Sequence, residues 1–505
     1  MQIEPSADAF AERYARGEAQ VVWTTLVSDL ETPVSAFLKI AGGQPMSFLL
    51  ESVEGGAVRG RYSVIGLKPD LIWRTNGGHA EINRTAQSTS ATFVPSKDPP
   101  LTALRALIAE SRITLPDGLP PMAAGVFGYL GYDMVRLMEE LPAPNPDPIG
   151  IPDAVLMRPT LVVVFDAVKD TITVVTPVRP ERGLSATAAL ARATERLSAV
   201  VDALDRPLDK SATALDPGPL AVAPTSNTTP AEYKAMVLNA KEYILAGDIF
   251  QVVLSQRFEA PFKLPPFSLY RALRRVNPSP YLYFLDYGDF AVAGSSPEIL
   301  VKLKGGKVTI RPIAGTRPRG PTLHEDKEME EQLLADPKER AEHLMLLDLG
   351  RNDVGRVAKI GTVSVTDQFF VERYSHVMHI VSNVEGEMAQ GRDAIDAMAA
   401  GFPAGTVSGA PKVRAMEIID ELEKEKRGLY AGCVGYFSAA GEMDSCIVLR
   451  TALVKDGKMY VQAGAGIVAD SNPASEQTEC INKATALFRA AEEARRFASA
   501  GKRGQ

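Results

Sequence analysis

Short stretches in which apolar and polar residues alternate recur along most of the chain and predict β-strands. In the first half these strands are expected at 21–23, 46–52, 61–66, 124–133, 155–165 and 171–175. In the second half they are expected at 249–258, 281–287, 290–293, 299–303, 308–311, 432–438, 445–454 and 459–463. Several of these strands follow one another without an intervening helix. This order favours antiparallel β-sheets packed with helices, an α+β class, over a doubly wound sheet.

Helical patterns lie between these strand groups. Helices are expected at 1–20, 101–111, 185–205, 229–246, 327–348, 392–399, 411–425 and 476–497. The clearest start is Thr229-Pro230-Ala231-Glu232, because Thr229 suits the N-cap, Pro230 the first helical position and Glu232 the reciprocal capping box. Gly247 is expected to end this helix.

A proline-rich stretch divides the chain. Residues 206–230 carry five prolines among Ser, Thr, Asp and Ala, which is typical of a linker or surface loop. With a length of 505 residues, the chain is too long for one ordinary core. We therefore predict two subdomains: an N-terminal domain at 1–205 and a catalytic domain at 229–497, joined by a linker at 206–228.

Composition narrows the class of protein. The chain is 45% apolar and 23% charged, with a net charge of −7, which argues against nucleic acid or an anionic membrane as the main partner. No apolar run is long enough for a membrane span, and the first residues lack the basic start and apolar core of a signal peptide. The three cysteines, Cys433, Cys446 and Cys480, form no metal motif. We expect buried thiols in a cytoplasmic protein.

Two acidic pairs are candidates for metal binding. Glu476 and Glu479 share one face of a predicted helix that follows a glycine turn, with Lys483 four residues further on; Glu339 and Glu342 share a face of another helix. Two such helices could hold one Mg²⁺, with some ligands acting through water. A solvated helix end with a salt bridge, or two ordinary surface helices, explains the same residues. The sequence does not show that the helices meet.

Three further features are candidates for substrate chemistry. The stretch 405–412 combines glycines and hydroxyls with a helix start, which suits an anion site; an ordinary N-cap at Ser408 is the alternative. His379 is a candidate general acid or base, or else a hydrogen-bonded core histidine. Arg450 ends an apolar strand and, if buried, needs a partner such as a substrate carboxylate.

Several ordered motifs together resemble the chorismate-utilising enzymes, and most closely the large-subunit (component I) family of anthranilate synthases. The matching stretches are 313–320, 342–353, 402–412 and 464–483, with 49–52 and 60–63 nearer the N-terminus. The resemblance implies the fold of that family, in agreement with the α+β expectation. It spans nearly the whole chain.

The resemblance implies the site. Glu342 and Glu479 would bind Mg²⁺ directly, with Glu339 and Glu476 acting through water, and the metal would hold the ring carboxylate of chorismate. The implied substrate contacts are Gly315, Thr316, Tyr430, Arg450, Gly464, Ala465, Gly466 and Lys483. Glu298 would act as an acid on the departing 4-hydroxyl, and His379 would assist the later loss of pyruvate. The implied reaction joins ammonia to chorismate and yields anthranilate and pyruvate.

Two positions separate this family from its relatives. Isochorismate and salicylate synthases carry a water-activating lysine where this chain has Gln251, and aminodeoxychorismate synthases typically carry a nucleophilic lysine where it has Ala314. Both differences favour anthranilate as the product. Its formation is the first committed step of tryptophan biosynthesis. Aminodeoxychorismate synthase component I remains the nearest alternative. A catalytically silent subunit with this fold is a second, which the retained glutamates and His379 disfavour.

The family also implies regulation and a partner. L-Tryptophan would act as a feedback inhibitor at motif residues Leu50, Glu51, Ser52, Asn277, Pro280, Tyr281 and Leu282, although a simple turn explains 277–280 as well. No cysteine lies in a glycine-rich nucleophile turn with a downstream His-x-Glu. Ammonia made from glutamine would therefore come from a separate amidotransferase subunit, in a heterotetramer with two copies of each chain.

Overall fold

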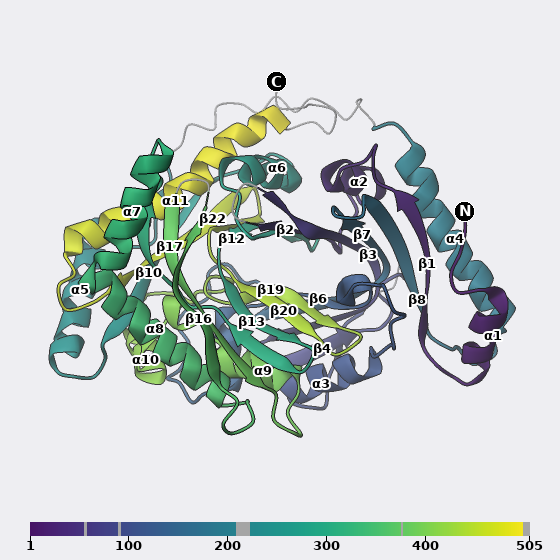
Figure 1. Ribbon diagram of the computed structural model, residues 1–505, viewed down its shortest axis with the longest axis horizontal. Coiled ribbons are helices and arrows are strands. Elements are labelled where there is room, and N and C mark those ends of the chain that lie inside the picture. The colour runs from purple at the N-terminus through teal and green to yellow at the C-terminus, as the bar shows by residue number, and fades with distance from the viewer. Residues whose placement is uncertain (55–57, 89–91, 209–222, 375–376, 498–505) are drawn as a thin grey trace.

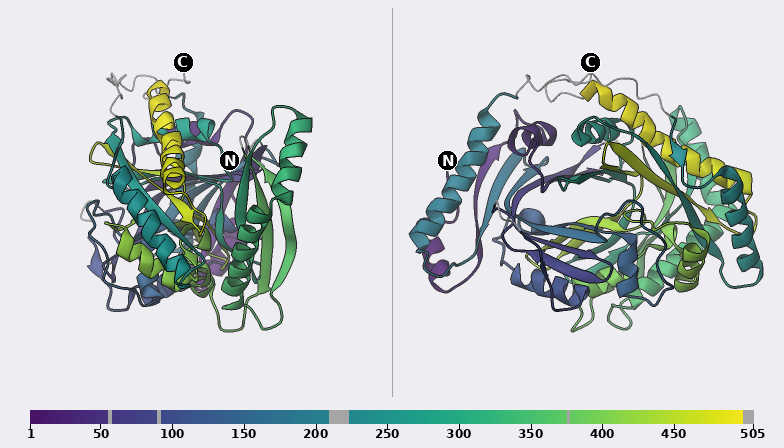
Figure 2. Two further views of the ribbon diagram at one scale, coloured as in Figure 1. Left: turned by 90° about the vertical axis from the view of Figure 1, so that its left-hand side faces the viewer. Right: turned by 180° about the vertical axis from the view of Figure 1, so that it is seen from behind.

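The computed structural model of the protein describes residues 1–505 apart from 55–57, 89–91, 209–222, 375–376 and 498–505. Most of the predicted linker at 206–228 therefore lies outside the described residues. Every strand pairing in the described ranges that joins two named strands is antiparallel, and the strands form two large layers (Figures 1 and 2). The α+β class with antiparallel sheets is confirmed.

The first layer runs from the N-terminal strands into the C-terminal half of the chain. Its order is β1 (Gln20–Val27), β8 (Thr171–Val178), β7 (Ala154–Asp166), β3 (Val58–Asn76), β2 (Ser47–Glu54), β11 (Tyr281–Asp286), β12 (Phe290–Ser296), β21 (Thr451–Lys455), β22 (Lys458–Ile467) and β10 (Gln251–Pro261). The pairing of β2 with β11 joins the two predicted domains within one sheet.

The second layer branches from the first half of β7. Its order is β6 (Gly125–Leu130), β19 (Cys433–Ser438), β20 (Met443–Ile447), β13 (Ile299–Lys304), β14 (Lys307–Ile310) and β17 (Val377–Glu387), and β17 also pairs with β15 (Ile313–Pro318) and β16 (Ser364–Arg373). Four short strands complete the sheets: β4 (His79–Asn83), β5 (Val94–Pro95), β9 (Thr225–Ser226) and β18 (Gly409–Ala410).

Helices cover the outer faces. The first layer packs against α1 (Ala7–Ala15), α2 (Pro33–Ile40), α4 (Ala186–Asp205), α6 (Pro266–Val276) and α11 (Pro473–Glu493) (Figure 1). The second layer packs against α3 (Pro100–Glu110) and α9 (Ala394–Gly401), whereas α5 (Pro230–Leu245) and α10 (Lys412–Leu422) lie against β10 at the end of the first layer. α7 (Leu323–Ala335) and α8 (Pro337–Gly355) flank β15–β17. Short 3₁₀ turns are η1 (Pro121–Ala123), η2 (Tyr132–Leu137), η3 (Gly405–Val407) and η4 (Ala494–Phe497).

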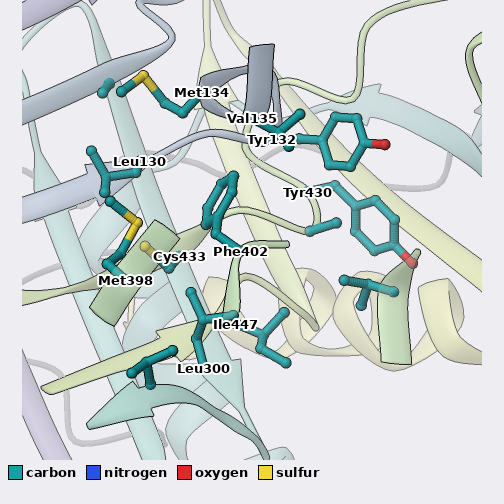
Figure 3. Close-up of a cluster of buried hydrophobic side chains, with 14 of the residues drawn as sticks. Leu130, Tyr132, Met134, Val135, Leu300, Met398, Phe402, Tyr430, Cys433 and Ile447 are labelled. Carbon is teal, nitrogen blue, oxygen red and sulfur yellow. The ribbon is translucent and has the colours of Figure 1, made fainter. Parts of the chain in front are cut away.

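Apolar cores join residues from both halves of the chain. Between the layers Phe48 stacks on Phe127 with ring centroids 4.7 Å apart, and Tyr129 meets Tyr287 edge to face at 5.5 Å. A second core brings Leu130 and Tyr132 together with Phe402 and Tyr430 (Figure 3). Because each of these cores contains side chains from both halves of the chain, packing within them stabilises the two halves against each other.

Several local predictions are confirmed. α5 begins with Thr229 as N-cap, and Thr229 and Glu232 form the reciprocal capping box. β7 and β8 cover the strands predicted at 155–165 and 171–175, and they pair with each other in the antiparallel sense that the sequence suggested for these two segments. Cys433, Cys446 and Cys480 are buried, free thiols. None of the helices in the described ranges is long and apolar enough to cross a membrane.

Two predicted elements are wrong because the backbone breaks inside them. The single helix at 327–348 is two helices: α7 ends at Ala335, and Pro337 opens α8 with Asp336 as its N-cap. Proline suits a helix start far better than an interior, because it has no N–H to donate. The single strand at 445–454 is β20 and β21, separated at Arg450, whose φ of 48° lies in the left-handed region.

Two serines that the sequence offered as helix caps do not act as caps: Ser475, which could have capped a helix beginning near Glu476, and Ser408, the alternative N-cap in the stretch 405–412. The N-cap of α11 is Asn472, whose side chain accepts from the backbone N–H groups of Ala474 and Ser475, so Ser475 lies inside the helix. The N-cap of α10 is Pro411 without a side-chain bond, while the Ser408 hydroxyl donates to the Ala404 carbonyl. Asparagine can accept from the first free N–H groups of a helix as well as serine can, which explains the cap of α11. In α10 the cap lies three residues after Ser408.

Candidate active site

A cavity of about 500 Å³ is lined by strands of both layers and by residues of α8 and α11. These two helices lie in the left half of Figure 1. The cavity has walls from β10, β15, β17, β22, η3 and both helices. It brings together almost all the sequence-predicted site residues, which are Gln251, Glu298, Gly315, Thr316, Glu339, Glu342, His379, Tyr430, Arg450, Gly464, Gly466, Glu476, Glu479 and Lys483. The helices that the sequence could not place next to each other do meet here.

A second cavity of about 750 Å³ adjoins the first and shares five residues with it: Pro297, His379, Arg450, Glu479 and Lys483. The shared residues carry an imidazole, a guanidinium, a carboxylate and an ammonium group, so the boundary between the two adjoining spaces is polar.

Four carboxylates converge across this site. Burial raises the pKa of Glu342, and the negative charge of Glu339 raises it further. Burial likewise raises the pKa of Glu476, aided by Glu479. Like charges in partly buried positions repel one another, so the arrangement favours a cation between them.

Two of these carboxylates form ion pairs with basic side chains. Lys483 lies 2.7 Å from Glu479, and Arg317 lies 3.0 Å from Glu339. In the described part of the chain, no three acidic, histidine or cysteine side chains are already gathered as a metal cluster. The donor set nevertheless fits Mg²⁺, because it consists of carboxylate oxygens on two facing helices, with space between them for water ligands. The Lys483 ammonium also donates to the Gly464 carbonyl at 2.9 Å, so it retains a partner when Glu479 turns to a metal.

Glu298 follows β12 and is 7% exposed. Burial raises the pKa of its carboxyl group to about 8, although a hydrogen bond from the Thr406 hydroxyl, at 2.9 Å, and the charge of Arg450 act in the opposite direction. A carboxyl group with this pKa is protonated at neutral pH, as a general acid must be.

His379 lies on β17, and burial lowers its pKa to about 4. Its Nδ1 lies 3.0 Å from the Gly315 carbonyl oxygen and 3.1 Å from the Thr316 hydroxyl. A carbonyl oxygen only accepts, so Nδ1 carries the proton and Nε2 keeps its lone pair. The ring is therefore a neutral base with a fixed tautomer at physiological pH.

Cationic and backbone groups on the opposite wall suit an anionic ligand. Arg450 reaches both cavities from the break between β20 and β21, and its left-handed backbone is a strained conformation typical of functional positions. At Gly464 a Cβ atom would lie 2.8 Å from the Tyr430 hydroxyl, so a side chain would close the cavity there. Ala465 lies between Gly464 and Gly466, which both border the cavity, but its own side chain is fully buried in the second core.

Sequence reasoning gave no individual role to four polar residues that line the cavity: Lys338, Thr406, Gln462 and Ser471. Thr406 belongs to the stretch that was expected to bind an anion, and its hydroxyl instead serves Glu298. Gln251 also borders the cavity, and its buried Oε1 has no hydrogen-bond donor among the described residues. That oxygen is available to an N–H group of a bound molecule.

A buried ion pair supports the walls of the cavity from behind. Arg427 and Glu423 are 2.6 Å apart, with side chains 1% and 5% exposed. The Arg427 guanidinium also donates to the carbonyls of Val407 and Val253, both at 2.7 Å. Glu423 accepts from Ser255, at its backbone N–H and its hydroxyl. The pair thus ties η3 to β10.

Arg427→Met is expected to destabilise the protein by about 3–5 kcal/mol, because Glu423 would keep a buried charge without its partner. Glu423→Gln/Arg427→Met should unfold at a higher denaturant concentration than Arg427→Met alone, since it removes that charge. Urea unfolding followed by circular dichroism measures both. Equal midpoints for the two variants would contradict the importance of the unpaired charge.

A third cavity, of about 530 Å³, separates β2 and β11 from the second layer. Of the residues predicted to bind an inhibitor, it is bordered by Leu50, Glu51, Ser52, Pro280, Tyr281 and Leu282. Ser52 faces Tyr281 across the strand pair, so both side chains lie on one side of the sheet. The predicted inhibitor residues thus gather at one space although they are far apart in sequence.

Three of these residues have other surroundings. The Glu51 carboxylate accepts from Arg274 of α6 at 2.7 Å and from the Tyr270 hydroxyl. Leu282 is buried on the same side of the sheet, in an apolar core that includes residues of α2 and α6. Successive strand residues alternate between faces, which explains why Glu51 and Leu282 turn away from Ser52 and Tyr281. Asn277 borders the adjoining 750 Å³ cavity instead.

Comparison with known proteins places these features in context. Residues 68–489 match the family described as chorismate binding enzyme. The chain is 60% identical to anthranilate synthase component 1 from Cereibacter sphaeroides over 98% of both chains. It resembles the crystal structure of anthranilate synthase component I from Streptococcus pneumoniae with a TM-score of 0.75 and 38% identity, covering 92% of this chain and 99% of that one. The isochorismate synthase MenF from Escherichia coli shares the fold, with a TM-score of 0.69 and 20% identity over 96% of this chain and all of the other.

Proposed function

This chain belongs to the chorismate-binding enzyme family, and we propose that it is the component I subunit of an anthranilate synthase. It converts chorismate and ammonia into anthranilate and pyruvate, a lyase reaction. The observation that carries the proposal is the gathering of four glutamates, a protonated Glu298, His379, Arg450 and Lys483 around one cavity.

Binding of chorismate follows from charge. Chorismate is a dianion, and the cavity offers Arg450, Lys483 and backbone donors beside the glutamates. Glu342 and Glu479 would hold a Mg²⁺ ion directly and Glu339 and Glu476 through water, and the bound ion would neutralise the ring carboxylate. Without a cation, that carboxylate would face four glutamates, so the charge balance supports the Mg²⁺ proposal.

The first step joins ammonia to C2 of the ring while the 4-hydroxyl leaves. The Gln251 Oε1 lacks a donor among the described residues. It would accept a hydrogen bond from an N–H of the incoming ammonia and so orient the nitrogen lone pair toward C2. The Glu298 carboxyl group gives its proton to the departing hydroxyl, which leaves as water. Because the Glu298 carboxyl group is neutral before this step, it places no further negative charge beside the chorismate dianion.

The second step removes the C2 proton and breaks the bond between C3 and the enolpyruvyl oxygen, so that the ring becomes aromatic. Nε2 of His379 is the free basic atom at the cavity, because Nδ1 donates to Gly315. It would take the C2 proton, while the enolpyruvate gains a proton and is released as pyruvate.

Ammonia would come from glutamine through a separate amidotransferase subunit. The component I designation of the relatives supports a second component. A heterotetramer with two of each subunit and a cytoplasmic location remain the expectations that accompany this assembly.

Product identification tests the proposal against its nearest rival. The purified chain, supplied with chorismate, Mg²⁺ and ammonium, should form anthranilate and pyruvate in equal amounts on chromatography. Accumulation of aminodeoxychorismate without pyruvate would favour aminodeoxychorismate synthase component I. Isochorismate as the main product would mean that Gln251 does not exclude water as nucleophile.

Feedback control by L-tryptophan would use the 530 Å³ cavity. Leu50 and Tyr281 border it as apolar walls for an indole, and Ser52 and Arg61 as polar groups. Tyr374 borders both this space and the cavity next to the active site, and its ring contacts His379 edge to face at 5.3 Å. A movement of Tyr374 would therefore couple tryptophan binding to the catalytic histidine.

Ser52→Ala is expected to raise the tryptophan concentration for half-inhibition about 5- to 100-fold, because the side chain facing the cavity loses its hydroxyl. The turnover number should stay close to that of the unchanged protein. Inhibition curves for anthranilate formation measure this, with the exposed strand residue Thr25→Ala as the control. An unchanged inhibition curve would place the inhibitor elsewhere.

A further inference from the structure

A separate cavity of about 470 Å³ lies at the other end of the first layer, between α4, the end of β8 and the residues after β4. Its described lining residues border neither the active-site cavities nor the 530 Å³ cavity. α4 and β8 form the opposite side of the molecule from α8 and α11 (Figure 1). The cavity is therefore remote from the proposed chemistry.

Arginines dominate this cavity, and some of them are neutralised. Arg84 is bound by Glu110 through two hydrogen bonds, both 2.9 Å. Arg192 lies 3.5 Å from Glu181 on the exposed rim. Asp70 also borders the cavity but is held by Arg158 through two bonds, at 2.8 and 2.9 Å. The acids at the cavity are thus already matched.

Two further guanidinium groups remain without a carboxylate in the described part of the chain. Arg179 follows β8; it donates only to the Ser111 carbonyl, at 3.4 Å, and its buried Nε has no acceptor. Arg196 on α4 donates to the Thr176 hydroxyl at 3.5 Å. Both contacts are long, so neither guanidinium has its hydrogen-bonding capacity filled.

The cost of this arrangement is visible at Arg179. Burial lowers the pKa of its guanidinium to about 10, and the nearby charge of Arg158 lowers it further, while the charges of Asp70 and Glu110 act in the opposite direction. Both of these carboxylates are already hydrogen-bonded to other arginines, so an added anion in the cavity would stabilise the buried Arg179 cation. Two guanidinium groups facing one cavity match the oxygen atoms of a phosphate particularly well.

The walls of the cavity also fit such a ligand. The Gln87 amide donates to the Lys68 carbonyl at 2.8 Å and to the Thr160 hydroxyl at 3.2 Å, so one wall is fixed by internal bonds. The volume exceeds that of a bare oxyanion. A phosphoryl group attached to a small organic molecule would fill more of the space than inorganic phosphate alone.

We propose that this cavity is a binding site for a phosphate or phosphoryl group, with Arg179 and Arg196 as its ligands. The site is independent of chorismate chemistry, so it stands or falls separately from the proposed function. Bound phosphate would give the buried Nε of Arg179 the acceptor that it lacks among the described residues and would tie α4 to the end of β8.

Calorimetric titration of the full chain with inorganic phosphate, and separately with glycerol 3-phosphate, tests the proposal. Wild type should bind at least one of them, and Arg179→Gln and Arg196→Gln should each weaken that binding at least about tenfold. Arg16→Gln, at an exposed position on the same half, is the control and should bind as wild type does. The comparison with Arg179→Gln separates this cavity from anion binding near Arg450.

Each outcome has a definite meaning. Binding of inorganic phosphate alone would identify a site for the free ion, and tighter binding of the ester would identify a phosphorylated metabolite. Thermal unfolding should show the same pattern, with phosphate raising the midpoint of wild type but not of Arg179→Gln. Equal binding by wild type and both variants, or no binding of either probe at 10-millimolar concentration (about the upper limit of relevance), would overturn the proposal.

Discussion

Glu298→Gln is expected to lower kcat by about 10²- to 10⁴-fold while leaving the fold intact. Glutamine keeps the shape of the side chain and can still accept from the Thr406 hydroxyl, which lies 2.9 Å from Oε1 of Glu298. It has no acidic proton to give to the 4-hydroxyl. Steady-state anthranilate formation at neutral pH measures the effect, and Glu331→Gln, at an exposed position on α7, is the matched control.

The pH dependence sharpens this prediction. Burial raises the pKa of Glu298 to about 8, so its acidic form predominates below that pH and is lost as the pH rises through it. The rate of wild type should therefore fall above about pH 8, and this limb should be absent from the residual rate of Glu298→Gln. A variant with near-normal activity, or one that keeps the alkaline limb, would show that Glu298 is not the acid.

Glu342→Gln and Glu479→Gln are each expected to lower Mg²⁺-dependent activity at least about 10³-fold, because a metal clamp on a developing charge contributes several kcal/mol. Each variant removes one charged oxygen donor from the facing helices α8 and α11. Direct titration with Mg²⁺ should show weakened metal binding in both variants, independently of activity. Circular dichroism should show an unchanged fold.

The control for these variants is Glu331→Gln, which lies outside the cavity on an exposed helix face. It should bind Mg²⁺ and turn over chorismate like wild type. Substantial activity in Glu342→Gln or Glu479→Gln, or metal binding equal to that of wild type, would remove the metal assignment from these glutamates.

Local signals in the sequence predicted what depends on neighbouring residues alone. Thr229, Pro230 and Glu232 define the start of α5 because their bonds close within one turn. The acidic pairs were recognised on their own helices for the same reason. That α8 and α11 face each other depends on how two sheets pack, and the spacing of Glu339 and Glu342 contains no information about Glu476 and Glu479.

Other features were missed because a local pattern has two meanings. Glu423 and Arg427 are four residues apart, as in an ordinary surface ion pair, yet they are buried behind the cavity. The apolar periodicity across 327–348 outweighed Pro337, which divides that segment into α7 and α8. Glu51 stood in a motif with Ser52, but strand alternation turned its carboxylate toward α6. Tertiary surroundings, which no single segment encodes, decide only the first case, whereas Pro337 and the alternation of strand residues are local signals that the longer patterns outweighed.

We propose that this chain alone makes anthranilate from chorismate and free ammonia. The most direct measurement follows anthranilate fluorescence when the purified chain is given chorismate, Mg²⁺ and ammonium, with glutamine in place of ammonium as the comparison. We expect steady anthranilate formation with ammonium, none with glutamine alone, and loss of the signal when Mg²⁺ is chelated. No anthranilate from ammonium, with the protein folded and Mg²⁺ present, would rule out this activity for the chain.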